Sequence, residues 1–210
     1  MRKAGLGFRV KSGWSAAVVM SGPSSSPHVV LSRRIDLSDP ARPETRQPYH
    51  ASDESKGELE TDENRLEERE RAVRIATARS VGGLLAESRE RGWMPQRAGL
   101  VAGSLIDPST ISHAHIRAHA MDGRLFRVVL EEVVTANELS CFVLAEKTAF
   151  EAARKVLRRP EESLKRALTT LGRRIGGPWR GEEKLAALAA WMAISGRATG
   201  SRPTDALTSP

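Results

Sequence analysis

Three side chains that can bind a metal or carry a proton recur at helical spacing in the second half of the chain. His115, His119 and Asp122 stand at positions i, i+4 and i+7, so a helix would carry all three on one face. This set suits a transition metal or a proton relay. It is also typical of a polar helix face with one hydrogen-bonded, half-buried histidine. Because no distant ligand can be identified, we favour that second interpretation and predict no metal and no cofactor.

Arginines and a tryptophan offer a second kind of chemistry, the binding of phosphates and bases. Arg117 and Arg124 stand at i and i+7 and could bind phosphate through paired donors, or could pair with the acids of residues 53–70. Arg180 follows Trp179, and the pair resembles a platform on which a base stacks. A tryptophan after Gly-Gly-Pro is equally typical of a plug that docks the last helix.

Alternating and helical hydrophobic patterns predict the elements that position these residues. Gly82-Gly83 falls inside the first long helix, where we expect another backbone to approach closely. The predicted strands are Leu6–Lys11, Trp14–Met20, His28–Leu37, Ala98–Gly103 and Leu139–Ala145. The predicted helices are Glu58–Arg91, one from Ser112 to Asn137, Lys147–Arg158, Pro160–Gly172 and Glu182–Ile194.

Composition indicates one globular domain, residues 1–196, with an irregular connection at 38–57 and a disordered tail at 197–210. The chain has 210 residues, a net charge of +7 and a pI of about 10.2. Bases outnumber acids between Glu151 and Lys184, which makes a polyanionic partner plausible. No apolar run is long enough to cross a membrane, no secretory signal is visible, and Cys141 has no cysteine to pair with. We therefore expect a cytoplasmic protein without a membrane partner.

The order of the predicted elements, three strands and then alternating helices and strands, resembles the ribonuclease H-like superfamily. The resemblance implies a five-stranded mixed α/β sheet, with three antiparallel strands followed by two β-α units and flanking helices. Nucleases of this superfamily hold two metals with carboxylates on the first strand, at the end of the fourth strand and in the final helix. The first position would fall near Val10, Lys11 or Ser12, and none of these is acidic.

Of the three expected acids, two are missing or displaced. Ser104 ends the fourth strand and the nearest acid, Asp107, comes three residues later. The final helix begins with Glu182 and Glu183, but alanines fill its next turns. We therefore do not expect an active two-metal nuclease. The actin-like branch of the superfamily cradles phosphates in its first hairpin and after its fourth strand, which would place Ser12 and Ser104 near a phosphate.

The carboxyl ends of the central strands should bring Lys11, Ser104 and Glu146 to one rim of the sheet, where ligands usually bind in open α/β sheets. Our leading hypothesis is a degenerate, non-catalytic domain that binds nucleic acid through its basic final third. One alternative is an enzyme or metal-binding protein that uses the His/Asp residues and Glu146 on a small or phosphorylated ligand. Another is a scaffold whose long helix docks a partner protein.

Overall fold

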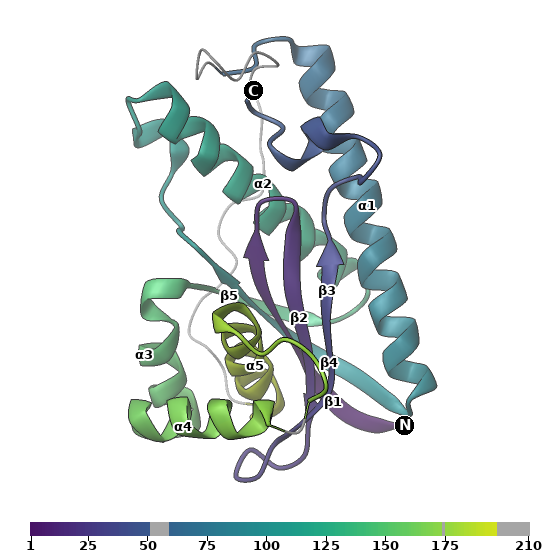
Figure 1. Ribbon diagram of the computed structural model, residues 1–210, viewed down its shortest axis with the longest axis vertical. Helices are drawn as coiled ribbons and strands as arrows, with labels where there is room; N and C mark the ends of the chain where they lie inside the picture. Colours follow the sequence, from purple (N-terminus) through teal and green to yellow (C-terminus); the bar gives the residue numbers. More distant parts are fainter. Residues whose placement is uncertain (51–58, 174, 197–210) are drawn as a thin grey trace.

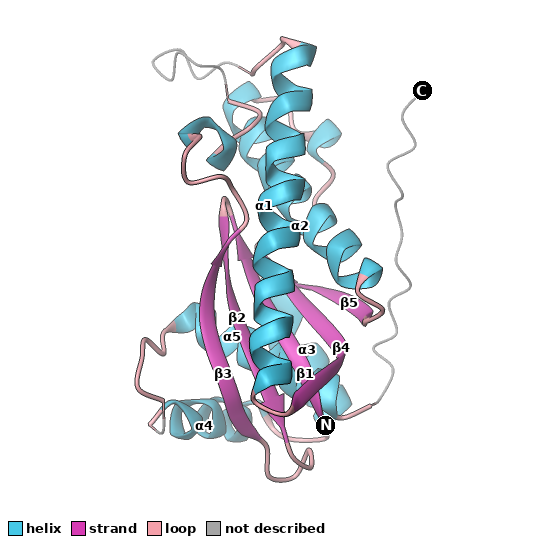
Figure 2. Ribbon diagram, turned by 90° about the vertical axis from the view of Figure 1, so that its right-hand side faces the viewer, coloured by secondary structure: helices cyan, strands magenta, loops and turns pink. Residues whose placement is uncertain are grey.

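A five-stranded sheet lies between two layers of helices in the computed structural model, which describes residues 1–50, 59–173 and 175–196. The strand order is β3-β2-β1-β4-β5. Helices α1 and α2 cover one face of the sheet, and α3, α4 and α5 cover the other (Figures 1 and 2). The central strand β1 therefore has helices on both sides.

The first three strands form an antiparallel meander, and the last two extend the sheet in parallel. Strands β1 (Arg2–Lys11), β2 (Trp14–Ser21) and β3 (His28–Asp36) pair in antiparallel fashion. Strands β4 (Trp93–Ala102) and β5 (Ser140–Ala145) run parallel to β1. These directions confirm the predicted topology, which places the carboxyl ends of β1, β4 and β5 at one edge of the sheet.

Strand β4 begins earlier than predicted, at Trp93 rather than at Ala98. Pro95 lies inside it, although a proline removes one hydrogen-bond donor from a sheet. The pairing with β1 shifts register between Ala4 and Gly5, opposite Pro95 and Arg97. A proline is tolerated at such an irregularity because the ladder of hydrogen bonds is already interrupted there.

Each face of the sheet packs its own hydrophobic core. On one face, Leu6, Phe8 and Val10 of β1 pack with α1 (Glu63–Glu90) and α2 (Ala114–Ala136). On the other face, alternate residues of β2, β4 and β5 pack with α3 (Glu146–Leu157), α4 (Glu161–Gly172) and α5 (Gly181–Ile194). Successive side chains of a strand point to opposite faces, so β1 turns its odd-numbered residues towards α5.

Two glycines of β1 let α5 lie directly on the strand. A Cβ added at Gly7 would lie 1.9 Å from the carbonyl oxygen of Ala186, and one at Gly5 would lie 2.7 Å from that of Ala190. The close approach expected at Gly82-Gly83 is wrong: α1 runs through both residues unbroken, and a Cβ at either would meet no atom within 4 Å. The neighbouring turns of α1 bury enough side chains to compensate for the low helix propensity of the two glycines.

The connection after β3 contains the short 3-10 helix η1 (Pro43–Arg46) and then runs to His50, which pairs with Leu59 in an isolated bridge. A second 3-10 helix, η3 (Pro108–Thr110), precedes α2. The predicted tail at 197–210 and residues 51–57 of the predicted 38–57 connection lie outside the described residues. Of the helices in the described part, none is both long and apolar enough to cross a membrane.

Candidate functional site

A buried arginine occupies the point where the three parallel strands end. Arg9, near the end of β1, is 4% exposed. One guanidinium nitrogen, Nη1, donates to the carbonyl of Val10 at 2.6 Å and lies 3.5 Å from that of Val101 in β4. The other, Nη2, forms an ion pair with the carboxylate of Glu146, the first residue of α3. Arg9 therefore ties the ends of β1, β4 and β5 together with a permanent positive charge.

A groove of about 420 Å³, the rim groove, opens beside Arg9 between this edge of the sheet and α2. Lys11, Ser12, Ser104 and His119, all predicted as site residues, line it together. The charged members of its lining other than histidine are all basic, and no Asp or Glu is among them. They are Arg9, Lys11, Arg124 and Arg127. The rim groove is therefore suited to an anionic ligand.

Acids sit outside the rim groove and balance part of this charge. Asp107 lies 4.0 Å from Arg124, and Glu131 lies 3.5 Å from Arg127. The backbone N–H of Ser109 donates to Asp107 and lowers the pKa of that carboxyl. Lys11 is half-buried and faces the groove from the end of β1. The four cations of the lining therefore outnumber by one the three acids that pair with them, Glu146, Asp107 and Glu131.

Large apolar side chains are exposed along the same groove. Leu105, Ile106 and Ile116 are 49%, 59% and 54% exposed, and all three line it. Exposed apolar groups beside a basic wall are typical of a surface that contacts a macromolecule. Nucleic-acid-binding proteins use such groups against bases while cations bind the phosphates.

The paired divalent metals of the superfamily's nucleases do not fit this rim. Their site needs several converging carboxylates, whereas the groove is lined by cations and Glu146 is already paired with Arg9. Glu183 accepts a hydrogen bond from the backbone N–H of Arg180 at 2.7 Å, so it caps α5. A guanidinium at the centre of the rim would repel a divalent cation.

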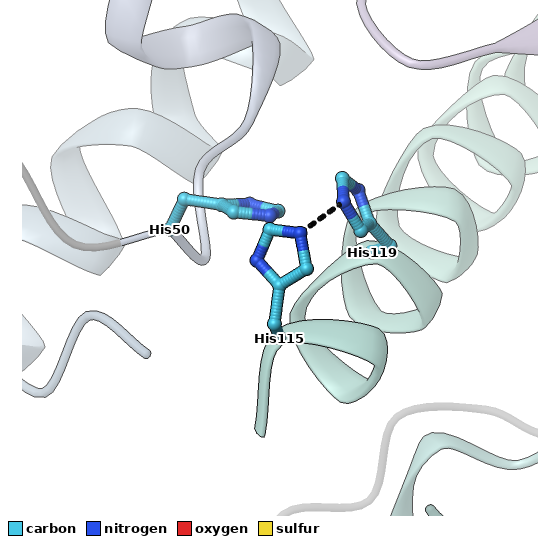
Figure 3. Close-up of side chains that lie close together, drawn as sticks. All are labelled: His50, His115 and His119. Atoms are coloured by element: carbon cyan, nitrogen blue, oxygen red, sulfur yellow. Dashed lines mark hydrogen bonds between the residues drawn. The ribbon is translucent and has the colours of Figure 1, made fainter. Parts of the chain in front are cut away.

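The predicted histidines meet a third one that comes from a distant loop. His115 and His119 lie one turn apart on α2, with their Nε2 atoms 3.1 Å apart. His50 stands over both rings, with centroid distances of 5.4 Å to His115 and 4.5 Å to His119 (Figure 3). These three residues form the histidine cluster. Partial burial and the neighbouring His115 lower the pKa of His119, which favours its neutral form.

Asp122 does not share the exposed helix face of the two histidines, although its spacing suggested that it would. It is fully buried, and its Oδ2 lies 3.0 Å from Nδ1 of His50, while its Oδ1 accepts a hydrogen bond from the backbone N–H of Tyr49 at 3.1 Å. Burial raises the pKa of Asp122 to about 7. The carboxyl therefore supports the loop that carries His50.

The remaining predicted residues lie elsewhere. Arg117 is half-buried on α2, and it and the exposed Arg180 are outside the lining of the rim groove. Trp179 donates from its ring nitrogen to the carbonyl of Leu168 at 2.7 Å, so it is the plug and not the stacking platform. Part of the basic final third is neutralised, since Lys155 pairs with Glu151 and Lys165 with Glu161.

Two residues that matter at this edge were missed in the sequence. Arg9 lies in the predicted strand Leu6–Lys11, and its burial could have been expected because apolar residues flank it near the end of that strand. His50 lies in an irregular connection, where no periodic pattern predicts its neighbours. Only the folding of that loop onto α2 brings it to His115 and His119.

Comparisons with known proteins establish the fold and no closer relationship. No protein-family model matches the chain, and no curated protein does either. The structure of RuvC from Thermus thermophilus is similar with a TM-score of 0.50 at 9% identity, over 91% of this chain and 92% of that one. The same protein in complex with a Holliday junction substrate gives 0.51 at 9% identity, over the same shares. The chain therefore has the ribonuclease H-like fold that its element order predicted.

Proposed function

We propose that this protein is a nucleic-acid-binding domain that does not cleave phosphodiesters with paired metals. The observation that carries the proposal is Arg9, a buried guanidinium directly before Val10, Lys11 and Ser12, the stretch where a nuclease of this fold would place its first carboxylate. A cation there opposes the binding of Mg²⁺, and Lys11 and Arg124 of the same groove favour that of a phosphate.

The composition of the rim groove favours nucleic-acid binding at this edge of the sheet rather than through the basic final third. Its wall combines Lys11, Arg124 and Arg127 with the exposed Leu105 and Ile106, so phosphates and bases would both find partners. The bases of α3 and α4 in part face acids on their own helices. The fold is also that of a protein solved with a Holliday junction substrate, which makes branched DNA the first probe to use.

Fluorescence anisotropy with a labelled four-way junction, a matched duplex and a single strand tests the proposal. Binding through phosphates should weaken steeply with salt, with a slope of about −0.9 per neutralised phosphate on duplex DNA. Replacing Lys11 and Arg124 by alanine should weaken binding and flatten that slope by ~2. Arg154→Ala and Arg158→Ala, both exposed on or just after α3, provide the matched control.

The outcomes separate the two surfaces. Loss of affinity in the groove variants alone supports the rim groove as the binding surface. Loss in the α3 variants alone would move the interface to the basic final third and overturn the assignment to the groove. No binding of any of the three probes at low salt would overturn the proposed function. Incubation with Mg²⁺ or Mn²⁺ should leave all three DNAs intact, and their cleavage would contradict the account of Arg9.

A further inference from the structure

The histidine cluster brings three nitrogen ligands to one point from two separate parts of the chain. The ligand atoms of His50, His115 and His119 all lie within 4.8 Å of one another, and Figure 3 shows the three rings converging. In a tetrahedral zinc site with Zn–N bonds of about 2.0–2.1 Å, ligand nitrogens are ~3.3 Å apart. The 3.1 Å between Nε2 of His115 and Nε2 of His119 is close to that separation.

The helix supplies two ligands without rearrangement. Residues four apart project from the same face of a helix one turn apart, so a metal can bridge them. Both histidines are exposed on the first turns of α2, where the metal could reach them from solvent.

The loop that carries the third ligand is fixed by a buried network. Arg69 of α1 is 4% exposed and donates to the carbonyls of Pro48 at 2.8 Å and His50 at 3.0 Å. The hydroxyl of Tyr49 donates to Glu70 at 2.6 Å. These contacts hold the backbone of His50 against α1 and α2, so the position of its ring above the two helical histidines is built in.

Asp122 stands where metal sites place an outer carboxylate. A ligand histidine usually directs its other ring nitrogen to a carboxylate or carbonyl, which fixes its orientation and makes it a better donor. Here the Oδ2 of Asp122 lies 3.0 Å from Nδ1 of His50, which would leave the Nε2 of that ring for the metal. A buried carboxylate behind a histidine that faces two others is the arrangement of a metal centre more than that of a polar surface.

We propose that His50, His115 and His119 bind one divalent transition-metal ion, with zinc as the expected occupant, and that Asp122 is a positioning residue for His50. Imidazole ligands select zinc, copper or nickel over magnesium and calcium, which prefer oxygen. Three protein ligands leave a fourth position for water, on the side where His115 and His119 are exposed. The site is separate in chemistry from the carboxylate site of the superfamily's nucleases and does not depend on nucleic-acid binding.

Equilibrium dialysis of the untagged full-length chain against zinc, with the bound metal measured by mass spectrometry, tests the site. We expect about one zinc ion per chain, with affinity lost by at least ~100-fold in His50→Ala, His115→Ala and His119→Ala, beyond the ~10–100-fold typical of losing an outer-shell partner. His113→Ala, at the N-cap of the same helix, is the matched control and should bind like the natural chain. Asp122→Asn should fall between the two.

Three further measurements separate loss of the metal site from loss of folding. Cobalt(II) should give the visible absorption of a tetrahedral nitrogen site, and circular dichroism of the metal-free variants should match that of the natural chain. Zinc should raise the melting temperature of the natural chain and not that of His115→Ala. Bound zinc below ~0.1 per chain, or unchanged binding in the cluster variants, would overturn the proposal. In that case the 3.1 Å contact between His115 and His119 is a hydrogen bond between the two rings.

Discussion

The rim groove and the histidine cluster share His119, yet they are suited to ions of opposite charge. The groove is lined by arginine and lysine and has the paired Arg9 at its centre. The cluster offers three imidazoles backed by a buried carboxyl. The first lies where the fold usually holds metals, and the second lies on a loop and a helix beside it. The position within a fold therefore does not determine the chemistry; the side chains that reach that position do.

The largest expected effect is on zinc affinity, which should depend on the histidine cluster and not on the rim groove. His119→Ala should lower zinc affinity by at least ~100-fold, whereas Lys11→Ala should leave it unchanged, because lysine is protonated at neutral pH and does not ligate zinc. Dialysis with both variants measures the difference. An equal loss in the two would show that the groove and the cluster are one site.

The second effect concerns the stability of the rim. Arg9→Ala removes a buried guanidinium with three partners and should lower the free energy of unfolding by about 2–3 kcal/mol, since hydrogen bonds to charged groups contribute ~1.5–3 kcal/mol. We add nothing to this loss for the ion pair with Glu146, because the side chain of Glu146 is 46% exposed. Urea unfolding of Arg9→Ala and of the natural chain measures this loss of free energy.

The control for Arg9→Ala is the substitution of an exposed arginine that also forms an ion pair. Arg33, whose side chain is 45% exposed, pairs with Glu87 on the other side of the sheet. Arg33→Ala should lower the free energy of unfolding by less than ~1 kcal/mol. If both variants lose the same amount, Arg9 is not the organising charge of the rim.

Nucleic-acid affinity should respond less strongly to any one side chain. Arg124→Ala should weaken binding of the junction by roughly tenfold at low salt, because one phosphate contact among several is lost. His115→Ala, which removes an exposed cluster residue outside the groove lining, should change it little. Anisotropy titrations compare the two, and a greater loss in His115→Ala would place the nucleic acid on the cluster.

The smallest effect is a pH dependence centred on Asp122. Burial raises the pKa of this carboxyl to about 7, whereas an unfolded aspartate titrates near 3.9. Its protonated form therefore stabilises the metal-free fold fully below pH ~4, and that contribution is lost as the pH rises through about 7. Asparagine stays neutral throughout.

Thermal unfolding in the presence of a chelator measures this contribution. The melting temperature of the natural chain minus that of Asp122→Asn should fall between pH ~5 and ~8, with each kcal/mol worth about 2–4 °C for a chain of this size. A difference that does not change with pH would contradict the account of a buried, protonated carboxyl.

The fold was predictable because its signals are local and periodic. The alternating polarity of residues 6–11, the run of Val and Ala in β2, the apolar stripe of α2 and the turn at Gly13 each follow from a few neighbouring residues. Two predictions failed where a local rule was overridden: the start of β4, which includes Pro95, and the close backbone approach at Gly82-Gly83 in α1. In both places packing of the whole element outweighed the preference of one residue.

The sequence alone determined the element order, the missing or displaced acids at two of the three expected nuclease positions, and the spacing of His115 and His119. Tertiary structure decided that Arg9 joins three strand ends and that His50 completes a cluster with two histidines of α2. The reason is physical: spacing along a strand or helix fixes which side chains share a face, because that geometry repeats. A contact between a loop and a helix more than sixty residues further along the chain depends on how the loop's own backbone is held, here by Arg69 and Asp122.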